Sequence, residues 1–474
     1  GVQAPGRVGL PPVMQRPDLP VRARLTVGSA LLLWVVRPSW LWRRELAGLA
    51  LLAALAAAGW FGGPGAVLGA WLGAGGRWLG AAAGPCLAVV AAWAVPWSRR
   101  RVARSWRRAR LRRHWDRAMR FADLTTVNDR IPRIRRERWV PAGERLLVRV
   151  PRGATVDDLD AERERVAAVL QVREVRVDRD IDRADLAHVD IVREDPFAGS
   201  GAGPLRWPWA SGAQRSLGDP VPLGIDDMGD RVAARLPGKH FLVGGEPESG
   251  KSVVLSLLLA AAALDPHAQV WGWDAKLVEL ALWRPIMTRF ADYDMDAAIT
   301  QQEDLVREMN ARYAVLERAG RRALRPGEAP VILAVTDELR FYTANLDRKA
   351  ARHFNALGLD VAARGRASLI VQASATQKPA GDVVPTGWRD LMALRWAMRC
   401  TTRDASDTIL GAGMATAGYD ASEIDIRTRG VGLLYAEGGM PRRVRSYYLD
   451  DNEIRSIVAR GAALRRLVAG DRWV

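Results

Sequence analysis

The chain has 474 residues, enough for two or three domains with cores of their own, and a formal net charge of +17. That charge makes polyanions the expected partners, either nucleic acid or an anionic membrane surface. Two cysteines exclude a disulfide framework, and five scattered histidines exclude a histidine metal cluster. Only five of the 70 basic residues are lysine, so a remaining lysine indicates a position where a compact ammonium group matters.

The N-terminal part divides into an arm and an apolar region. Residues 1–45 are rich in proline and arginine and are expected to form a flexible basic arm. Residues 46–97 contain one charged side chain, Arg77. The twenty residues 78–97 have the length that crosses a hydrocarbon core of ~30 Å. The segment before them spans such a core only if it borrows residues from the glycine-rich piece between. The sequence therefore predicts a two-helix transmembrane hairpin over 46–97.

Arginines flank this hairpin on both sides. Arg43 and Arg44 precede it, and eleven arginines lie between residues 99 and 120. Because positive charge stays on the cytoplasmic side, both ends of the hairpin are expected there. We therefore expect a protein of the cell membrane whose later domains lie in the cytoplasm. The alternative is a buried, alanine-rich helical hairpin in a soluble protein.

Two smaller parts follow the hairpin. Residues 98–130 are predicted to form a basic helix on anionic headgroups, with direct DNA contact as the alternative reading. Residues 131–197 alternate strand, helix and strand, then show a second short helical and strand pattern, which indicates a small α/β module without a catalytic constellation. A Gly/Pro-rich linker is predicted over 198–219, a large domain over 220–448 and a helical tail over 449–474.

A phosphate-binding loop is predicted where the short apolar strand KHFLVGG meets a long helix-forming run. The octet GEPESGKS fits the pattern G-x-x-x-x-G-K-[ST]. Its glycines let the loop curl so that N–H groups and the helix N-terminus face a phosphate. The lysine would place its charge between the β- and γ-phosphates of ATP, and the last serine would take one Mg²⁺ position. The predicted ATP-binding residues are Gly245, Glu246, Pro247, Glu248, Ser249, Gly250, Lys251 and Ser252.

Two further strands are predicted to end at the same site. APVILAVTDEL has the apolar run of a strand buried on both faces, followed by Asp337 and Glu338. Asp337 would hold Mg²⁺ through water, and Glu338 would act as general base on the attacking water. ASLIVQASATQKP ends in Gln377, a polar side chain placed to sense the γ-phosphate, although these residues alone indicate only a strand and a turn. Lys251, Asp337, Glu338 and Gln377 are the predicted catalytic residues.

At this point the chain resembles the FtsK/SpoIIIE family of membrane-anchored DNA translocases. The likeness covers about residues 220–448 and rests on blocks in the family's order. They are GEPESGKS, WGWDAKLVELALW with Asp274 and Lys276, EMNARY, VTDEL, RASLIVQASATQKP, TTRDASDTILGAGMA and GVGLLY. Gln372 and Ser374 stand where the family is apolar, so that strand is expected to pack differently.

The resemblance implies a RecA-like motor that forms a hexameric ring around double-stranded DNA, with ATP at the subunit interfaces. It also implies an arginine that reaches in from a neighbouring subunit, for which Arg366, Arg395 and Arg399 are candidates. Some 25 residues follow Tyr448, whereas the chromosomal translocases end in a winged-helix module. The layout is therefore similar to the transfer proteins of actinobacterial integrative or conjugative elements. Chromosome segregation and protein secretion by a related ATPase are the alternatives.

Overall fold

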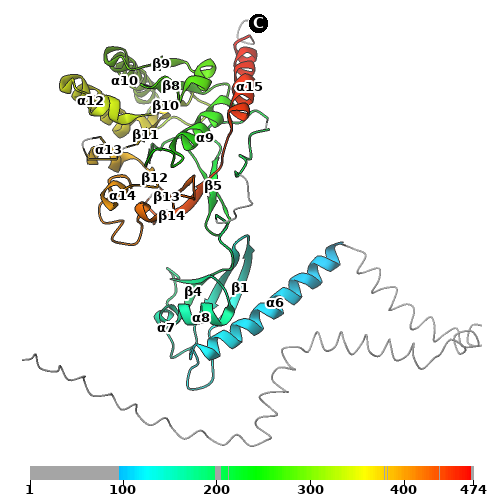
Figure 1. Ribbon diagram of the computed structural model, residues 1–474. Coiled ribbons are helices and arrows are strands. Elements are labelled where there is room, and N and C mark those ends of the chain that lie inside the picture. The colour runs from blue at the N-terminus through cyan, green and yellow to red at the C-terminus, as the bar shows by residue number, and fades with distance from the viewer. Residues whose placement is uncertain are drawn as a thin grey trace, which may run out of the picture. The chain divides into compact units, whose positions relative to one another are not determined.

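The computed structural model describes residues 96–197, 204–211, 213–377, 379–381, 383–436 and 438–470 (Figure 1). The chain divides into two compact units, residues 1–123 and residues 124–474. The expected arm and nearly all of the expected transmembrane hairpin lie outside the described residues. Within the described ranges, no helix combines the length and the apolar character that a membrane crossing needs.

The described part of the first unit contains one long helix. Helix α6 runs over Pro96–Phe121 and holds the arginine-rich stretch of the sequence. Arg120 pairs with Asp116 one turn earlier at 3.1 Å. The predicted basic helix thus forms, but it ends at Phe121, before residue 130.

Residues 131–197 form a small antiparallel module in the second unit. Its strand order is β1-β2-β4-β3. The elements are β1 (Arg133–Val140), β2 (Gly143–Arg149), α7 (Val156–Ala161), α8 (Arg163–Leu170), β3 (Glu174–Arg179) and β4 (Leu186–Val192). A β-hairpin comes first, and only a turn joins β3 to β4, where a second short helix was expected. The Asp180 carboxylate forms this turn by accepting the N–H groups of Asp182 and Arg183.

The larger domain is built on a ten-stranded mixed sheet of order β6-β5-β14-β13-β12-β7-β11-β10-β8-β9. The strands from β12 to β9 in this order pair in parallel, and those from β6 to β12 pair antiparallel. The bounds are β5 (Val221–Asp226), β6 (Arg231–Ala234), β7 (Phe241–Gly244), β8 (Gln269–Trp273), β9 (Arg289–Ala291), β10 (Ile332–Thr336), β11 (Ile370–Thr376), β12 (Leu394–Met398), β13 (Val431–Ala436) and β14 (Arg442–Ser446).

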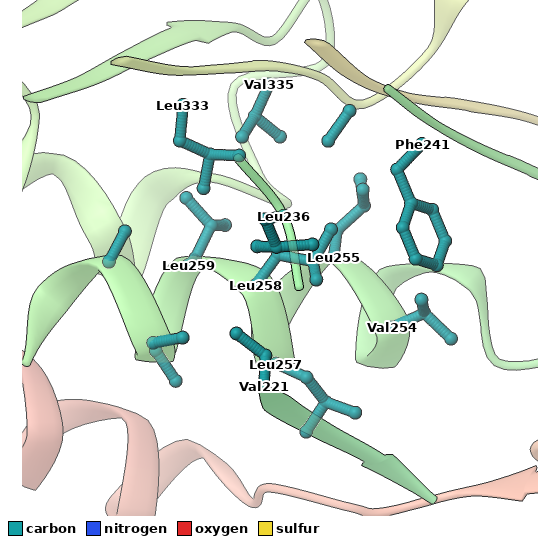
Figure 2. Close-up of a cluster of buried hydrophobic side chains, with 14 of the residues drawn as sticks. Val221, Leu236, Phe241, Val254, Leu255, Leu257, Leu258, Leu259, Leu333 and Val335 are labelled. Atoms are coloured by element: carbon teal, nitrogen blue, oxygen red, sulfur yellow. The ribbon is translucent and has the colours of Figure 1, made fainter. Parts of the chain in front are cut away.

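Helices cover both faces of this sheet, which explains why its central strands β7, β10, β11 and β12 are buried along their whole length. The helices are α9 (Lys251–Ala263), α10 (Met295–Arg318), α11 (Leu339–Thr343), α12 (Arg348–Arg364), α13 (Thr386–Leu391), α14 (Arg403–Leu410) and α15 (Asp451–Gly470), with 3₁₀ turns η2 (Ala281–Ile286), η3 (Gly365–Ser368) and η4 (Ala421–Glu423). One core lies between the sheet and α9, where Leu255, Leu258 and Leu259 face Leu333 and Val335 of β10 (Figure 2). The burial of each such leucine stabilises the fold by about 1.5–3 kcal/mol.

The C-terminal helix α15 packs on the end of α9 (Figure 1). A Cβ atom at Gly461 would lie 2.5 Å from the carbonyl oxygen of Ala263, so the two helices meet where only glycine fits. The guanidinium of Arg465 donates to the carbonyls of Ala262 and Ala263 at 2.9 and 2.8 Å. A cation there satisfies the last carbonyls of α9 and opposes the negative end of its dipole.

Charged pairs join the small module to the turn between β5 and β6. Three arginines of the module pair with Asp227 and Asp230 of that turn and with Asp226 at the end of β5. Arg138 and Arg145 each lie 2.7 Å from Asp230. Arg145 also lies 3.5 Å from Asp226, and Arg176 pairs with Asp227.

The expected linker also contains residues that the structure describes. Trp207 is buried in the core of the large domain and donates its indole N–H to the carbonyl of Pro222 at 3.0 Å.

Candidate nucleotide site

Four parallel strands bring the predicted site residues to one edge of the sheet. Gly244 at the end of β7 is in register with Thr376 at the end of β11. Thr336 at the end of β10 is in register with Ser374 of β11 and with Trp273 of β8. The residues that follow these strand ends therefore meet at the carboxyl edge, where ligands of open α/β sheets bind.

The loop between β7 and α9 needs glycine at two positions. Gly245 has a φ of 153°, and a Cβ there would lie 2.8 Å from the Cβ atom of Met398. Gly250 has a φ of 115° and is the N-cap of α9. Both values lie in the left-handed region that other residues rarely adopt. The loop is thus shaped by its glycines, while Pro247 and Glu248 are exposed at its tip.

Arginines from other parts of the chain pair with both acids of the loop. The Arg399 guanidinium lies 3.0 Å from a carboxylate oxygen of Glu246, and Arg429 donates to Glu248 at 2.8 Å. The carbonyl of Ser249 accepts the N–H of Gly430 at 3.1 Å, which ties the loop to the start of β13. These contacts offset the loop's two negative charges, which would otherwise repel an anion at the loop.

Lys251, the first residue of α9, is buried with its amine turned into the loop. Its Nζ donates to the carbonyl of Glu246 at 2.5 Å. Burial lowers the pKa of Lys251 to about 8, and the carboxylates of Glu338 and Asp337 oppose that shift. The ammonium is therefore held at the centre of the loop, where it can bind the oxygens of a phosphate chain.

Asp337 and Glu338 follow β10 on the opposite side of the site. The Asp337 side chain is 6% exposed, and its Oδ2 atom has no hydrogen-bond partner among the described residues. Burial raises the pKa of Asp337 to about 7, although Lys276 lowers it. Glu338 is oriented from β11, since its Oε1 accepts the Thr376 hydroxyl at 3.1 Å and the Gln377 N–H at 3.3 Å. One carboxylate of the pair thus keeps an unpartnered oxygen in the site, and the other is held in place by two hydrogen bonds.

A lysine that sequence reasoning gave no role completes the site. The Lys276 Nζ lies 3.6 Å from Asp337 Oδ2 and 3.5 Å from Glu338 Oε2. Asp274, which is fully buried, shapes the turn after β8 by accepting the N–H groups of Lys276 at 3.0 Å and Leu280 at 2.9 Å. Two sequence signals pointed to Lys276: its place in the block WGWDAKLVELALW, and the scarcity of lysine, since two of the five lysines lie in this site.

The residues present fit a magnesium ion bound together with nucleotide phosphates. In the part of the chain that the structure describes, no group of three His, Cys, Asp or Glu side chains is placed to hold a metal alone. Mg²⁺ commonly takes one or two protein ligands and fills its other positions with water and phosphate oxygens. The unpartnered Oδ2 of Asp337 and the half-buried Ser252 are the groups available for it.

The three candidate arginines have different positions. Arg395 is 8% exposed and lies over the ring of Tyr435 at 4.0 Å, so its guanidinium does not reach the surface. Arg399 is engaged with the loop of its own chain. Arg366 is exposed, and its Nε donates to the carbonyl of Gly238 at 2.8 Å. Of the three, only Arg366 has an exposed side chain that forms no ion pair with a carboxylate of the described residues.

Strand β11 accommodates its two polar residues inside the core. Gln372 donates its amide to the carbonyl of Gly358 at 3.2 Å, and its backbone N–H donates to His240 Nδ1 at 3.0 Å. Gln372 and Ser374 are both buried. Gln377 follows the strand, half-buried, and contributes its backbone N–H to the site.

Residues 215–384 match the model of the FtsK/SpoIIIE family. The DNA translocase FtsK of Staphylococcus epidermidis is 24% identical over 335 residues, which cover 62% of this chain and 38% of that relative. The protein of the same name from Bacillus cereus is 27% identical over 261 residues, covering 50% of this chain and 31% of the relative. The chain thus spans well under half the length of these relatives.

Solved structures were also found similar. The pCW3 conjugation coupling protein TcpA has a TM-score of 0.48 at 17% identity and covers 73% of this chain and 98% of its own. ATPases 2 and 3 of EssC from Geobacillus thermodenitrificans have a TM-score of 0.45 at 16% identity, with 56% and 52% covered. Residues 215–384 are thus similar to the FtsK/SpoIIIE family, and the loop between β7 and α9 lies within this matched part.

Proposed function

We propose that this protein is an ATP-driven translocase of double-stranded DNA. The observation that carries the proposal is the convergence of Lys251, Asp337 and Glu338 at one sheet edge, in a domain that matches the FtsK/SpoIIIE model. Lys251 would bind the β- and γ-phosphates, Asp337 and Ser252 would hold Mg²⁺, and Glu338 would accept a proton from the attacking water. The bound Mg²⁺ would neutralise charge that develops on the phosphates.

We further propose that the protein works at the cell membrane, with the ATPase domain in the cytoplasm, and that it assembles as a hexameric ring around DNA. The cargo would be a mobile element that passes between cells. These statements rest on the apolar and arginine-rich N-terminal sequence and on the family resemblance. Chromosome segregation is the nearest alternative, and secretion of proteins is the alternative with a different substrate.

The test is ATP hydrolysis by the full chain with and without linear double-stranded DNA, over a series of salt concentrations. DNA should raise the rate many-fold, and the effect should fade with salt because phosphate contacts release counterions. Lys251→Ala should lose nucleotide binding, whereas Glu338→Gln should bind ATP and fail to hydrolyse it. Hydrolysis that is indifferent to DNA would contradict the translocase and favour a secretion ATPase.

A further inference from the structure

A large basic pocket lies in the small module, apart from the nucleotide site. Its volume is about 900 Å³, and its walls come from the start of β1, the end of β2, the loop that leads to α7 and the β3–β4 turn. Six arginines and two aspartates line it, an excess of four positive charges. The arginines are Arg130, Arg133, Arg135, Arg149, Arg152 and Arg179.

The sheet places these arginines next to one another. Arg133, the first residue of β1, is in register with Arg149, the last residue of β2. Neighbouring strands lie about 4.8 Å apart, so the two side chains leave the sheet side by side, and Asp185 offsets the charge of Arg149 but not that of Arg133. Arg152 follows in the next loop, and all three side chains are exposed. The pairing of β1 with β2 therefore fixes the backbone positions of Arg133 and Arg149 next to each other.

The acids of the pocket do not neutralise it. Asp185 lies 2.6 Å from Arg149, and Asp157 lies 2.7 Å from Arg179, so both carboxylates are already paired. The other four arginines, Arg130, Arg133, Arg135 and Arg152, have no carboxylate within ion-pair distance in the described part of the chain. Four guanidinium groups without a protein counter-charge face one concave space, which is a favourable place for a polyanion.

We propose that this pocket binds the phosphodiester backbone of DNA, as a contact separate from the ATPase domain. Guanidinium groups match phosphate oxygens in a two-pronged geometry. Among the apolar lining residues, the half-buried Ile131 offers a surface to a sugar, whereas Val150 and Val156 are buried beneath the arginines. A flat lipid surface would meet only the rim of a concave site. The choice of DNA as the polyanion rests on the proposed function, and contacts of this kind would not read sequence.

The test compares two double variants of the full chain. Arg135→Ala with Arg152→Ala removes two pocket arginines, and Arg136→Ala with Arg322→Ala removes two exposed arginines that do not line the pocket. Binding of a short fluorescent DNA duplex is measured without ATP over a salt series. The pocket variant should bind about tenfold more weakly, with a log–log salt slope smaller by about two, and the control should bind like the wild type. Hydrolysis of ATP without DNA should be unchanged in both.

Three outcomes would overturn the proposal. If the pocket variant binds the duplex as tightly as the control, the pocket is not a DNA site, and a preserved stimulation of hydrolysis by DNA would leave the motor function standing. If the pocket variant loses binding to phosphatidylglycerol vesicles but not to the duplex, the ligand is a lipid headgroup. If the wild type neither binds the duplex nor hydrolyses ATP faster with it, the pocket proposal and the translocase fail together.

Discussion

The Lys276 ammonium lies 3.6 Å from Asp337 Oδ2, a buried carboxylate oxygen without a hydrogen-bond partner among the described residues. It lies equally close to Glu338, at 3.5 Å. The single cation therefore holds both acids of the site in place before a metal ion and a nucleotide add their own charges.

Loss of this lysine should impair hydrolysis more than nucleotide binding. Lys276→Met should lower kcat about 10- to 100-fold, the range found when a group that orients a metal ligand is removed. Because Lys276 lowers the pKa of Asp337, its loss should also move the acid limb of the pH–rate profile to higher pH. Lys276→Arg, which keeps the charge, is the matched control. Steady-state rates and ATP affinity across pH measure both effects, and an unmoved acid limb would contradict the electrostatic role.

The affinity for Mg·ATP should be greatest between about pH 7 and about pH 8. Asp337, with its pKa raised to about 7 by burial, must lose its proton to hold Mg²⁺, so affinity falls as the pH drops below 7. Lys251, with its pKa lowered to about 8 by burial, must keep its proton to attract phosphate, so affinity also falls above 8. On each side of this range, the affinity can fall by up to about tenfold per pH unit. Titration calorimetry of Glu338→Gln measures it without turnover, and the further change Asp337→Asn should flatten the acid limb alone.

His240 should make the folded state sensitive to mild acid. It is fully buried between β7 and β11, and burial lowers its pKa to about 4. Its pKa is lower in the folded chain than in the unfolded chain, so only the unfolded chain gains a proton as the pH falls from 6.5 to 4. Stability should be complete above pH 6.5 and fall by about 2 kcal/mol by pH 5.

Urea midpoints followed by tryptophan fluorescence between pH 7.5 and 5 measure this loss. In His240→Asn, the side-chain oxygen can still accept the Gln372 N–H, but no proton is gained. A pH slope that is as steep in this variant as in the wild type would assign the acid sensitivity to other groups.

Arg465→Met should destabilise the large domain by about 2–3 kcal/mol. The change removes charged hydrogen bonds to the carbonyls of Ala262 and Ala263 and leaves those carbonyls buried. Arg466→Met, the exposed neighbour on the same helix, is the control and should have almost no effect. Equal urea midpoints for the two variants would show that the contact adds nothing to stability.

Much of the site could be predicted because its signals are local. The glycine pattern, the lysine and the apolar runs that end in Asp337 or Gln377 are each contained in a dozen residues, and parallel strands bring such ends together. The roles of Lys276 and Arg465 could not be predicted in this way. Lys276 acts through the register between β8 and β10, and Arg465 acts on a helix about 200 residues earlier in the chain.

The remaining differences have physical causes of the same kind. Arg395 was a candidate for the arginine that reaches into a neighbouring subunit, but it lies buried in β12, the strand next to β7, where helices cover both faces of the sheet. The module's opening hairpin was read as one strand because its charged β1 shows no clean alternation of apolar and polar residues. Composition alone could not distinguish a turn from a short helix between β3 and β4.

The crossing of α9 and α15 has a mechanical consequence. Helix α9 is a stiff rod of 13 residues, about 20 Å long, with the phosphate loop at one end and the Gly461 contact and Arg465 at the other. Because glycine at 461 leaves no gap between the two helices, a tilt of the rod cannot be absorbed at their crossing. Any movement of the loop on binding a phosphate would therefore swing the last helix of the domain, and a reporter attached after residue 470 would register the state of the nucleotide.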